Sequence, residues 1–255
     1  MKFTPLGIIN PTPKPVEIPI HERKDFHLIV LGGMVLAGCA GFVNICSILT
    51  TTVTVSHNTG IFTRMSQQFG SGEIKAALFK FLILLCYLFG SAFVGFFLQK
   101  EKFYLTRKYG MFFILESLLL FIVARLYDNN EHTYSVLISS FAMGLQNGLF
   151  TNFSGAVVRT THVTGLITDV GLIIGHFIRG KEQTTDLWRL KVLVPLMIGF
   201  FSGAFLGGIC HTIFDHAAMY FPAVILGSAG TFWTILRIKS QMNKKPKYNS
   251  NYELV

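Results

Sequence analysis

Long apolar runs separated by short polar stretches make up the chain between residues 26 and 238. Several of these runs reach the roughly 20 residues that a helix needs to cross a bilayer. The first run also carries small residues that suit close helix packing, among them Gly38 and Gly41. The predicted spanning helices cover residues 26–49, 76–98, 110–127, 133–151, 191–212 and 217–238. The pattern therefore predicts an all-α integral membrane protein.

Two further stretches, residues 50–70 and 157–179, carry polar residues inside the apolar pattern. Both contain the pattern His-x-Thr-Gly-x-x-Thr, which begins at His57 in the first stretch and at His162 in the second. An asparagine precedes each copy at nearly the same spacing: Asn44 closes Gly-Phe-Val-Asn, and Asn147 closes Gly-Leu-Gln-Asn. These matches indicate an internal duplication in which each copy interrupts an apolar element with polar atoms.

The duplication extends beyond these motifs, since Ser-Ala-Phe-Val-Gly at 91–95 is echoed by Gly-Ala-Phe-Leu-Gly at 203–207. Repeat one would cover residues 26–127 and repeat two residues 133–238, together forming one transmembrane domain over 26–238. Each repeat is expected to have three spanning helices plus one broken or re-entrant helix. In the alternative, the interrupted elements cross fully and the protein has seven or eight spans.

The distribution of charge favours the re-entrant arrangement with the second repeat inverted. Positive residues hold cytoplasmic segments of membrane proteins in place. With re-entrant elements, the basic loops 99–109 and 180–190 and both termini lie inside, whereas the acidic loops 128–132 and 213–216 lie outside. Full crossing would place the most basic loop, 99–109, outside. The residues that count against the re-entrant arrangement are Arg64, Lys75 and Lys80.

The composition agrees with a membrane location. Only 14% of the 255 residues are charged and 51% are hydrophobic, whereas a soluble domain carries roughly 25% charged residues. The net charge of +9 lies mostly in loops and tails, with no basic face for nucleic acid. Residues 1–25 are expected to form a disordered cytoplasmic tail and 239–255 a basic cytoplasmic tail. The four cysteines show no metal-ligand spacing.

The two polar motifs are the predicted solute site, because inverted repeats commonly bind solutes at the midplane between broken helices. Thr59 and Thr164 are expected to cap helices that begin at the following glycines, which let the backbone approach a ligand. The two histidines offer donor, acceptor or proton-carrying groups. In the alternative, they are packing residues bonded to Asn44 and Asn147. The candidate solute-binding residues are Asn44, His57, Thr59, Gly60, Asn147, Arg159, His162, Thr164 and Gly165.

Three charged residues complete the candidate set. Arg159 beside a helix N-terminus would favour an anionic group, or alternatively reach the cytoplasmic headgroups. Asp169 follows the second motif and is a candidate coupling residue that could pair with Arg159 or a histidine. Glu116 lies among apolar residues and is a candidate for coupling or for a salt bridge to a neighbouring helix. His176, His211 and His216 lie near the ends of predicted spans, where surface positions are expected.

Phe-Ala-Met-Gly-Leu-Gln-Asn at 141–147 and Gly-Ala-Val-Val-Arg at 155–159, followed by the second His-x-Thr-Gly copy, resemble the YoaK-type family of uncharacterised inner-membrane proteins. Ala-Gly-Phe-Val-Asn at 40–44 resembles its other common block. That family more often has aspartate at the position of Asn44, and tyrosine often stands at the position of His162. The resemblance covers about 30–240 and implies a multi-pass protein of the bacterial inner (plasma) membrane, with suspected transport but no established substrate.

The sequence thus predicts a transporter or channel-like permease for a small polar solute, with an anion as one option, at a site between the two repeats. The expected partners are the lipid bilayer and the solute; nucleic acid is not expected, and a homo-oligomer stays open. No cofactor or metal is expected. A non-transporting scaffold is the first alternative. A membrane-embedded enzyme using His57, His162 and Asp169 is the second, although no catalytic motif such as HExxH is present.

Overall fold

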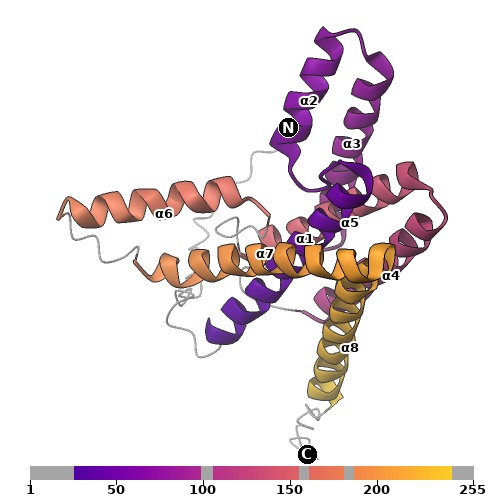
Figure 1. Cartoon of the computed structure of the whole chain (residues 1–255). Helices are drawn as coiled ribbons and strands as arrows, with labels where there is room; N and C mark the ends of the chain where they lie inside the picture. Colours follow the sequence, from indigo (N-terminus) through magenta and orange to yellow (C-terminus); the bar gives the residue numbers. More distant parts are fainter. Residues whose placement is uncertain (1–25, 99–105, 155–160, 181–186, 243–255) are drawn as a thin grey trace, which may run out of the picture.

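The computed structural model describes residues 26–98, 106–154, 161–180 and 187–242, and these residues form helices joined by short connections, without strands (Figure 1). The predicted all-α class is confirmed. The tails over 1–25 and 243–255 lie outside the described residues. In chain order the helices are α1 (Phe26–Thr51), α2 (Asn58–Gly70), α3 (Ile74–Phe97), α4 (Arg107–Asp128), α5 (His132–Ser154), α6 (Val163–Ile178), α7 (Leu187–Phe214), the 3-10 helix η3 (Asp215–Met219) and α8 (Tyr220–Met242).

Most of the long helices are suited to a bilayer. Helices α1, α3 and α4, and the continuous helical stretch Leu187–Lys239 that joins α7 to α8, are long and apolar enough to cross a membrane. Large apolar side chains also cover the outside, and Phe96, Phe201 and Phe232 are all more than 60% exposed. Water would penalise so much exposed apolar surface, whereas lipid does not. The chain is therefore a helical membrane protein.

Helix α5 matches the predicted span 133–151 but is not among the apolar candidates. Its polar side chains are buried against neighbouring helices rather than exposed to lipid. Ser140 donates a hydrogen bond to the Ile83 carbonyl of α3 at 2.9 Å, and Gln146 donates one to the Leu36 carbonyl of α1 at 2.6 Å. Because its sides face other helices, α5 does not need the apolar surface of a lipid-facing span.

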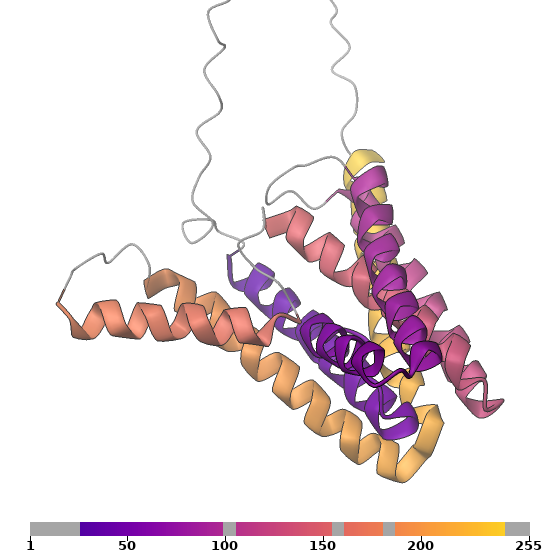
Figure 2. The same cartoon turned by 90° about the horizontal axis from the view of Figure 1, so that it is seen from above.

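The long helices pack in pairs: α1 lies along α7, α3 along α5 and α4 along α8 (Figures 1 and 2). Glycines bring the backbones into close approach at two of these crossings. A Cβ atom at Gly41 would collide with the Phe200 carbonyl of α7, and one at Gly144 with the Tyr87 carbonyl of α3. Small residues of this kind drive helix association in membranes, where the hydrophobic effect does not.

Helices α2 and α6 differ from the others in length. They have 13 and 16 residues, and α2 lies beside α3 while α6 lies beside α7 (Figure 2). Each is shorter than the roughly 20 residues that a spanning helix needs. These two short helices lie within the polar stretches 50–70 and 157–179 that the sequence singled out, and each begins inside its His-x-Thr-Gly motif, directly after the histidine.

Candidate functional site

The first motif follows a break in the helical backbone after α1. Thr52 has a left-handed backbone conformation, with φ of 59°, which ends the helix. The amide side chain of Asn44 then stabilises the irregular segment: its Oδ1 accepts hydrogen bonds from the Val55 N–H at 3.0 Å and the Ser56 N–H at 3.3 Å. Because Asn44, Val55 and Ser56 are all buried, these bonds satisfy backbone donors that water does not reach.

Asn147 has a matching position before the second motif. Its Oδ1 accepts a hydrogen bond from the Thr161 hydroxyl at 3.0 Å, and its Nδ2 donates one to the Met143 carbonyl at 2.9 Å. Residues 155–160 lie outside the described residues, and Arg159 is among them. Each asparagine thus holds the segment that leads into a short helix, and the Oδ1 of Asn44 binds backbone N–H groups rather than a histidine.

The two short helices begin in the same way. His57 precedes α2 with φ of −90° and ψ of 68°, and His162 precedes α6 with φ of −89° and ψ of 61°. The carbonyl of each histidine accepts the first helical hydrogen bond, from Ile61 and from Leu166, at 3.1 Å in both cases. The two motif copies therefore share one backbone geometry.

The prediction that Thr59 and Thr164 cap these helices is wrong. The helices begin one residue before each threonine, at Asn58 and at Val163, and neither preceding histidine makes a side-chain capping bond. The chain becomes helical directly after the histidine, so each threonine lies inside the first turn. Backbone N–H groups at the start of both helices consequently receive no capping hydrogen bond from the histidine that precedes each helix.

Both motif copies line one partly open cavity of about 760 Å³. This volume lies within the range of about 300–1,000 Å³ that small-molecule pockets occupy. Of the predicted solute-binding residues, those that line it are Asn44, His57, Thr59, His162, Thr164 and Gly165. The structure thus brings together two segments that are about one hundred residues apart in the sequence.

Two other predicted solute-binding residues, Gly60 and Asn147, do not line the cavity but contact residues that do. A Cβ atom at Gly60 would lie 2.7 Å from Nε2 of His57, so the imidazole ring lies directly over this glycine. Asn147 is 4% exposed and accepts a hydrogen bond from the hydroxyl of Thr161, a residue that lines the cavity. At Gly165 a Cβ atom would meet nothing within 4 Å, which leaves that part of the wall open.

Asp169 lines the cavity from α6, and its carboxylate is paired. Its Oδ2 accepts a hydrogen bond from the Arg189 guanidinium of α7 at 2.9 Å. The expected partner of Asp169 was Arg159 or a histidine, and the structure shows Arg189 instead. Arg189 was missed because its separation of 20 residues matches no helical spacing, and only the pairing of α6 with α7 brings the two together.

Glu116 lies away from the cavity, in the interior of the helix bundle. It is fully buried in α4, and neither carboxylate oxygen has a hydrogen-bond partner among the described residues. The neighbouring Ser117 hydroxyl donates to the Ala223 carbonyl of α8 at 2.6 Å, which fixes this face of α4 against α8. The salt bridge to a neighbouring helix that the sequence left open is absent from the described part of the chain.

Comparison with known proteins places the chain in a family without an assigned activity. A family model described as a protein of unknown function (DUF1275) matches residues 32–232. The match contains both His-x-Thr-Gly copies and both asparagines. Neither curated proteins nor solved structures gave a match.

Proposed function

The chain belongs to the DUF1275 family of proteins of unknown function, and we propose that it is a membrane permease for a small polar solute with anionic character. The observation that carries the proposal is the single cavity lined by both motif copies. Irregular backbone survives at membrane depth only where protein buries it or where it lines a wet cavity. Here Asn44 accepts hydrogen bonds from the buried backbone after α1, and the adjoining residues Ser56 to Thr59 line the cavity.

The chemistry of the cavity favours an anionic or oxygen-rich solute. The first turns of α2 and α6 both contribute to its wall, and the histidine before each helix does not cap its N-terminal N–H groups. Helix N-termini carry partial positive charge and bind anions. The hydroxyls of Thr59 and Thr164 and the two imidazoles add hydrogen-bond donors. Asp169, the one carboxylate among the described residues of the wall, is compensated by Arg189.

We further propose that the chain is a duplicated pair of repeats, with α1 to α4 equivalent to α5 to α8. Under this assignment the pairing of α1 with α7 is the equivalent of α5 with α3, and both pairings occur. Close glycine contacts support it too, because they recur with an offset of 103 residues between α1 and α5 and of 113 residues between α3 and α7, one residue more than in the sequence echo at 91–95 and 203–207. The matched contacts are Gly41 with Phe200 and Gly144 with Tyr87, and Gly203 with Gly38 and Gly90 with Phe141.

The second repeat is proposed to be inverted, with α2 and α6 re-entering from the side that they left. The lengths of these two helices support re-entry rather than full crossing. The protein would then lie in the bacterial inner membrane with both termini in the cytoplasm, because that orientation puts the basic loops inside. Such inverted repeats commonly alternate access to a central site by rocking against each other.

Two acidic residues stay candidates for coupling in this proposal. Asp169 is already in the cavity wall, where release from Arg189 would change the charge that a solute meets. Glu116 is a buried carboxyl group in a bilayer-spanning helix, and such groups commonly have functional roles. Because Glu116 does not line the cavity, its coupling role would require movement of α4.

The alternatives receive less support. A non-transporting scaffold would need no water-accessible cavity between the motifs, and the cavity therefore favours the permease. An embedded enzyme would use His57, His162 and Asp169 together. Within the described residues these three do not form a group with metal-ligand spacing, and the Asp169 carboxylate is held by Arg189.

The test is an osmotic swelling assay of proteoliposomes that contain the purified protein. Isosmotic potassium chloride, nitrate, phosphate and acetate are the probes, and valinomycin carries the potassium. We expect the wild-type protein to accelerate swelling in at least one salt and the His57→Ala and Thr164→Ala variants to lose most of that acceleration. Phe232→Ala, a variant of a lipid-facing residue of α8, is the matched control and should behave as wild type.

Two results would contradict the proposal. The first is a wild-type protein that moves none of the four anions. The second is transport that both cavity variants leave unchanged, which would remove the motifs from the solute path. Gel filtration of each variant in detergent ensures that lost transport is not caused by misfolding.

A further inference from the structure

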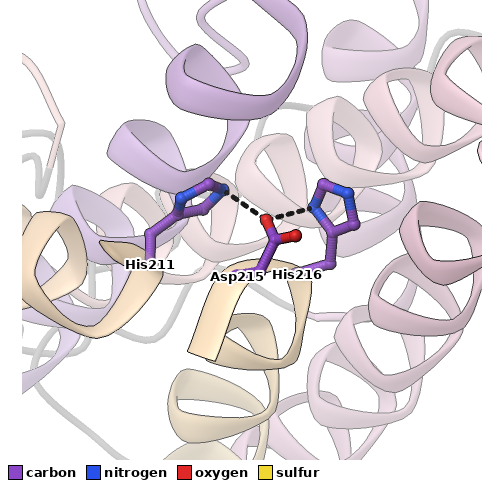
Figure 3. A group of neighbouring side chains, drawn as sticks. All are labelled: His211, Asp215 and His216. Carbon is purple, nitrogen blue, oxygen red and sulfur yellow. Dashed lines mark ion pairs between the residues drawn. The ribbon is translucent and has the colours of Figure 1, made fainter. Parts of the chain in front are cut away.

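Three side chains with metal-ligating atoms converge at the turn between α7 and α8 (Figure 3). His211 comes from the last turn of α7, and Asp215 and His216 come from η3. The Asp215 Oδ1 lies 3.7 Å from the His211 Nε2 and 3.3 Å from the His216 Nδ1. All three ligand atoms lie within 4.8 Å of one another. None of these residues lines the solute cavity.

These distances match the edges of a metal coordination polyhedron. Zinc binds imidazole nitrogen and carboxylate oxygen at about 2.0–2.2 Å, so two ligands of a tetrahedral ion lie about 3.3–3.5 Å apart. The pairs that include Asp215 are already at or close to this spacing. Two imidazoles and one carboxylate are also a common set of three protein ligands for a transition-metal ion that keeps one position open.

A fourth polar atom comes from α1. The Thr50 hydroxyl oxygen lies 3.0 Å from the His211 Nε2 and 3.5 Å from the His216 Nδ1, the two nitrogens that would bind the ion. This hydroxyl is placed to bind a water molecule in the open coordination position or to occupy that position itself. The group of atoms therefore links three elements, namely α1, α7 and η3.

The backbone at Asp215 ends α7 and turns the chain into η3. Asp215 has φ of 52°, the left-handed conformation that aspartate tolerates better than most residues and that commonly ends a helix. Its side chain is 73% exposed, so an ion pair with either histidine is screened by solvent and contributes little. The carboxylate is therefore free of a strong competing interaction and available to bind an ion.

We propose that His211, Asp215 and His216 form a binding site for a divalent transition-metal ion, with zinc as the best match to their ligand set. The ion would join the end of α7 to the start of α8 and hold this turn against Thr50 of α1. The imidazoles are mostly buried, with 14% and 24% of their side chains exposed, while the exposed carboxylate leaves an entry path from solvent. The sequence analysis expected surface positions for both histidines.

A further histidine and a tyrosine lie next to the three ligands, on the side of His216. The His132 ring, at the start of α5, lies 6.3 Å from the His216 ring, and the Tyr127 ring lies 5.8 Å from it. The Nδ1 of His132 is buried and has no hydrogen-bond partner among the described residues. It is too far away to be a ligand in this geometry, but it can accept or donate a hydrogen bond to metal-bound water. Residues in this outer layer orient the ligands of metal sites.

The experiment uses full-length protein in detergent micelles after removal of any histidine tag and any bound metal. Titration with cobalt(II), which replaces zinc and reports its geometry by visible absorption, should give one equivalent of bound ion with the absorption of a four- or five-coordinate site. Zinc should displace cobalt, whereas magnesium, which prefers oxygen ligands, should not. His211→Ala and His216→Ala should each weaken binding by about 100-fold or more, since even changes in the outer layer cost roughly 10–100-fold.

His176→Ala is the matched control, because His176 is an exposed histidine in the last turn of α6. This variant should bind cobalt as wild type does. Asp215→Asn gives a second, milder test that keeps the shape of the turn and should weaken binding while the protein stays folded. Wild-type protein that binds less than one-tenth of an equivalent would overturn the proposal. Equal affinity of the wild type and both alanine variants would do the same, because the ion would then be bound elsewhere.

Discussion

The two His-x-Thr-Gly copies use the same backbone geometry but differ in charge and in packing. Both follow an asparagine-stabilised segment, and both begin a short helix at a histidine with nearly equal φ and ψ. Seven residues after the histidine, however, α2 carries exposed Arg64 and α6 carries Asp169 in the cavity wall. The two copies thus share the asparagine and the histidine that shape the backbone before each helix. They differ in the charged residue that follows, which is basic in copy one and acidic in copy two.

The two copies also differ in the space around their motif glycines, Gly60 and Gly165. The His57 ring fills the space over Gly60, whereas the space at Gly165 is open. The helices that follow also differ, since α2 is polar and α6 is apolar over most of its length. Copy one is therefore the more closely packed of the two at the motif glycine, and copy two is the one that adds a charged pair, Asp169 with Arg189.

The largest expected effect concerns the glycines at the two equivalent helix crossings. Gly41→Ala and Gly144→Ala should each destabilise the protein by about 1–3 kcal/mol, because an added Cβ meets a backbone carbonyl that cannot move aside. The two variants should lose a similar amount of stability, because Gly41 and Gly144 occupy equivalent positions in the two proposed repeats. Thermal unfolding in detergent measures it, and Gly165→Ala is the control with open space. A large loss for one glycine and none for the other would contradict the equivalence of the repeats.

Replacing Asn44 should have a comparable or slightly smaller effect. Asn44→Ala leaves two buried backbone N–H groups without an acceptor, at a cost of about 1–3 kcal/mol. Asn44→Asp keeps the acceptor and should retain most of the stability. In copy two, Thr161→Val removes a single hydroxyl bond and should cost less, about 0.5–1.5 kcal/mol. Equal thermal stability of Asn44→Ala and wild type would show that the break does not depend on this side chain.

The Asp169–Arg189 pair should affect the solute more than the fold. Both side chains are about one-third exposed, so Arg189→Ala should change stability by no more than about 1 kcal/mol. It leaves the Asp169 carboxylate uncompensated in the cavity wall and should raise the half-saturating anion concentration about 5- to 10-fold. Asp169→Asn should lower the half-saturating anion concentration, because it removes the negative charge and leaves that of Arg189. Concentration-dependent uptake in proteoliposomes measures both, and opposite shifts would contradict an anionic solute.

The smallest effect is expected at the motif glycines themselves. Gly60→Ala should displace the His57 ring and reduce uptake several-fold, with stability changed by less than about 0.5 kcal/mol because the ring can rotate away. Gly165→Ala should leave both quantities close to wild type. Uptake and thermal unfolding of the two variants, measured in parallel, sharpen the contrast between the copies. A stronger transport defect in Gly165→Ala than in Gly60→Ala would contradict the expected difference between the two copies.

Much of the fold could be predicted from the sequence because lipid constrains it strongly. The predicted spans 26–49 and 110–127 differ by only a few residues from α1 and α4, since apolar runs of that length have few alternatives to a helix. The polar interruptions were also visible, because Asn44, His57 and Thr59 stand out against apolar neighbours. Their repetition at His162 indicated that the two distant segments belong together, and both line the cavity.

The missed features depend on tertiary contacts or on backbone conformation. Thr59 fits the residue preferences of a helix cap, yet the chain becomes helical one residue earlier. Arg189 reaches Asp169 only because α6 folds back along α7. His211 and His216 were expected at the surface, and the left-handed turn at Asp215 instead directs all three side chains to one point. The spacing of His211, Asp215 and His216 was a signal that could have been noticed.

The central claim is that both motif copies line one water-filled cavity. We would replace the four native cysteines by alanine, introduce Thr59→Cys and Thr164→Cys together, and treat the protein in membranes with a short, water-soluble reagent that joins two thiols. The account predicts that both positions react and that one reagent molecule links them, whereas Thr59→Cys combined with lipid-facing Phe232→Cys gives no link. Failure of either cavity position to react, or reaction at both without a link, would contradict it.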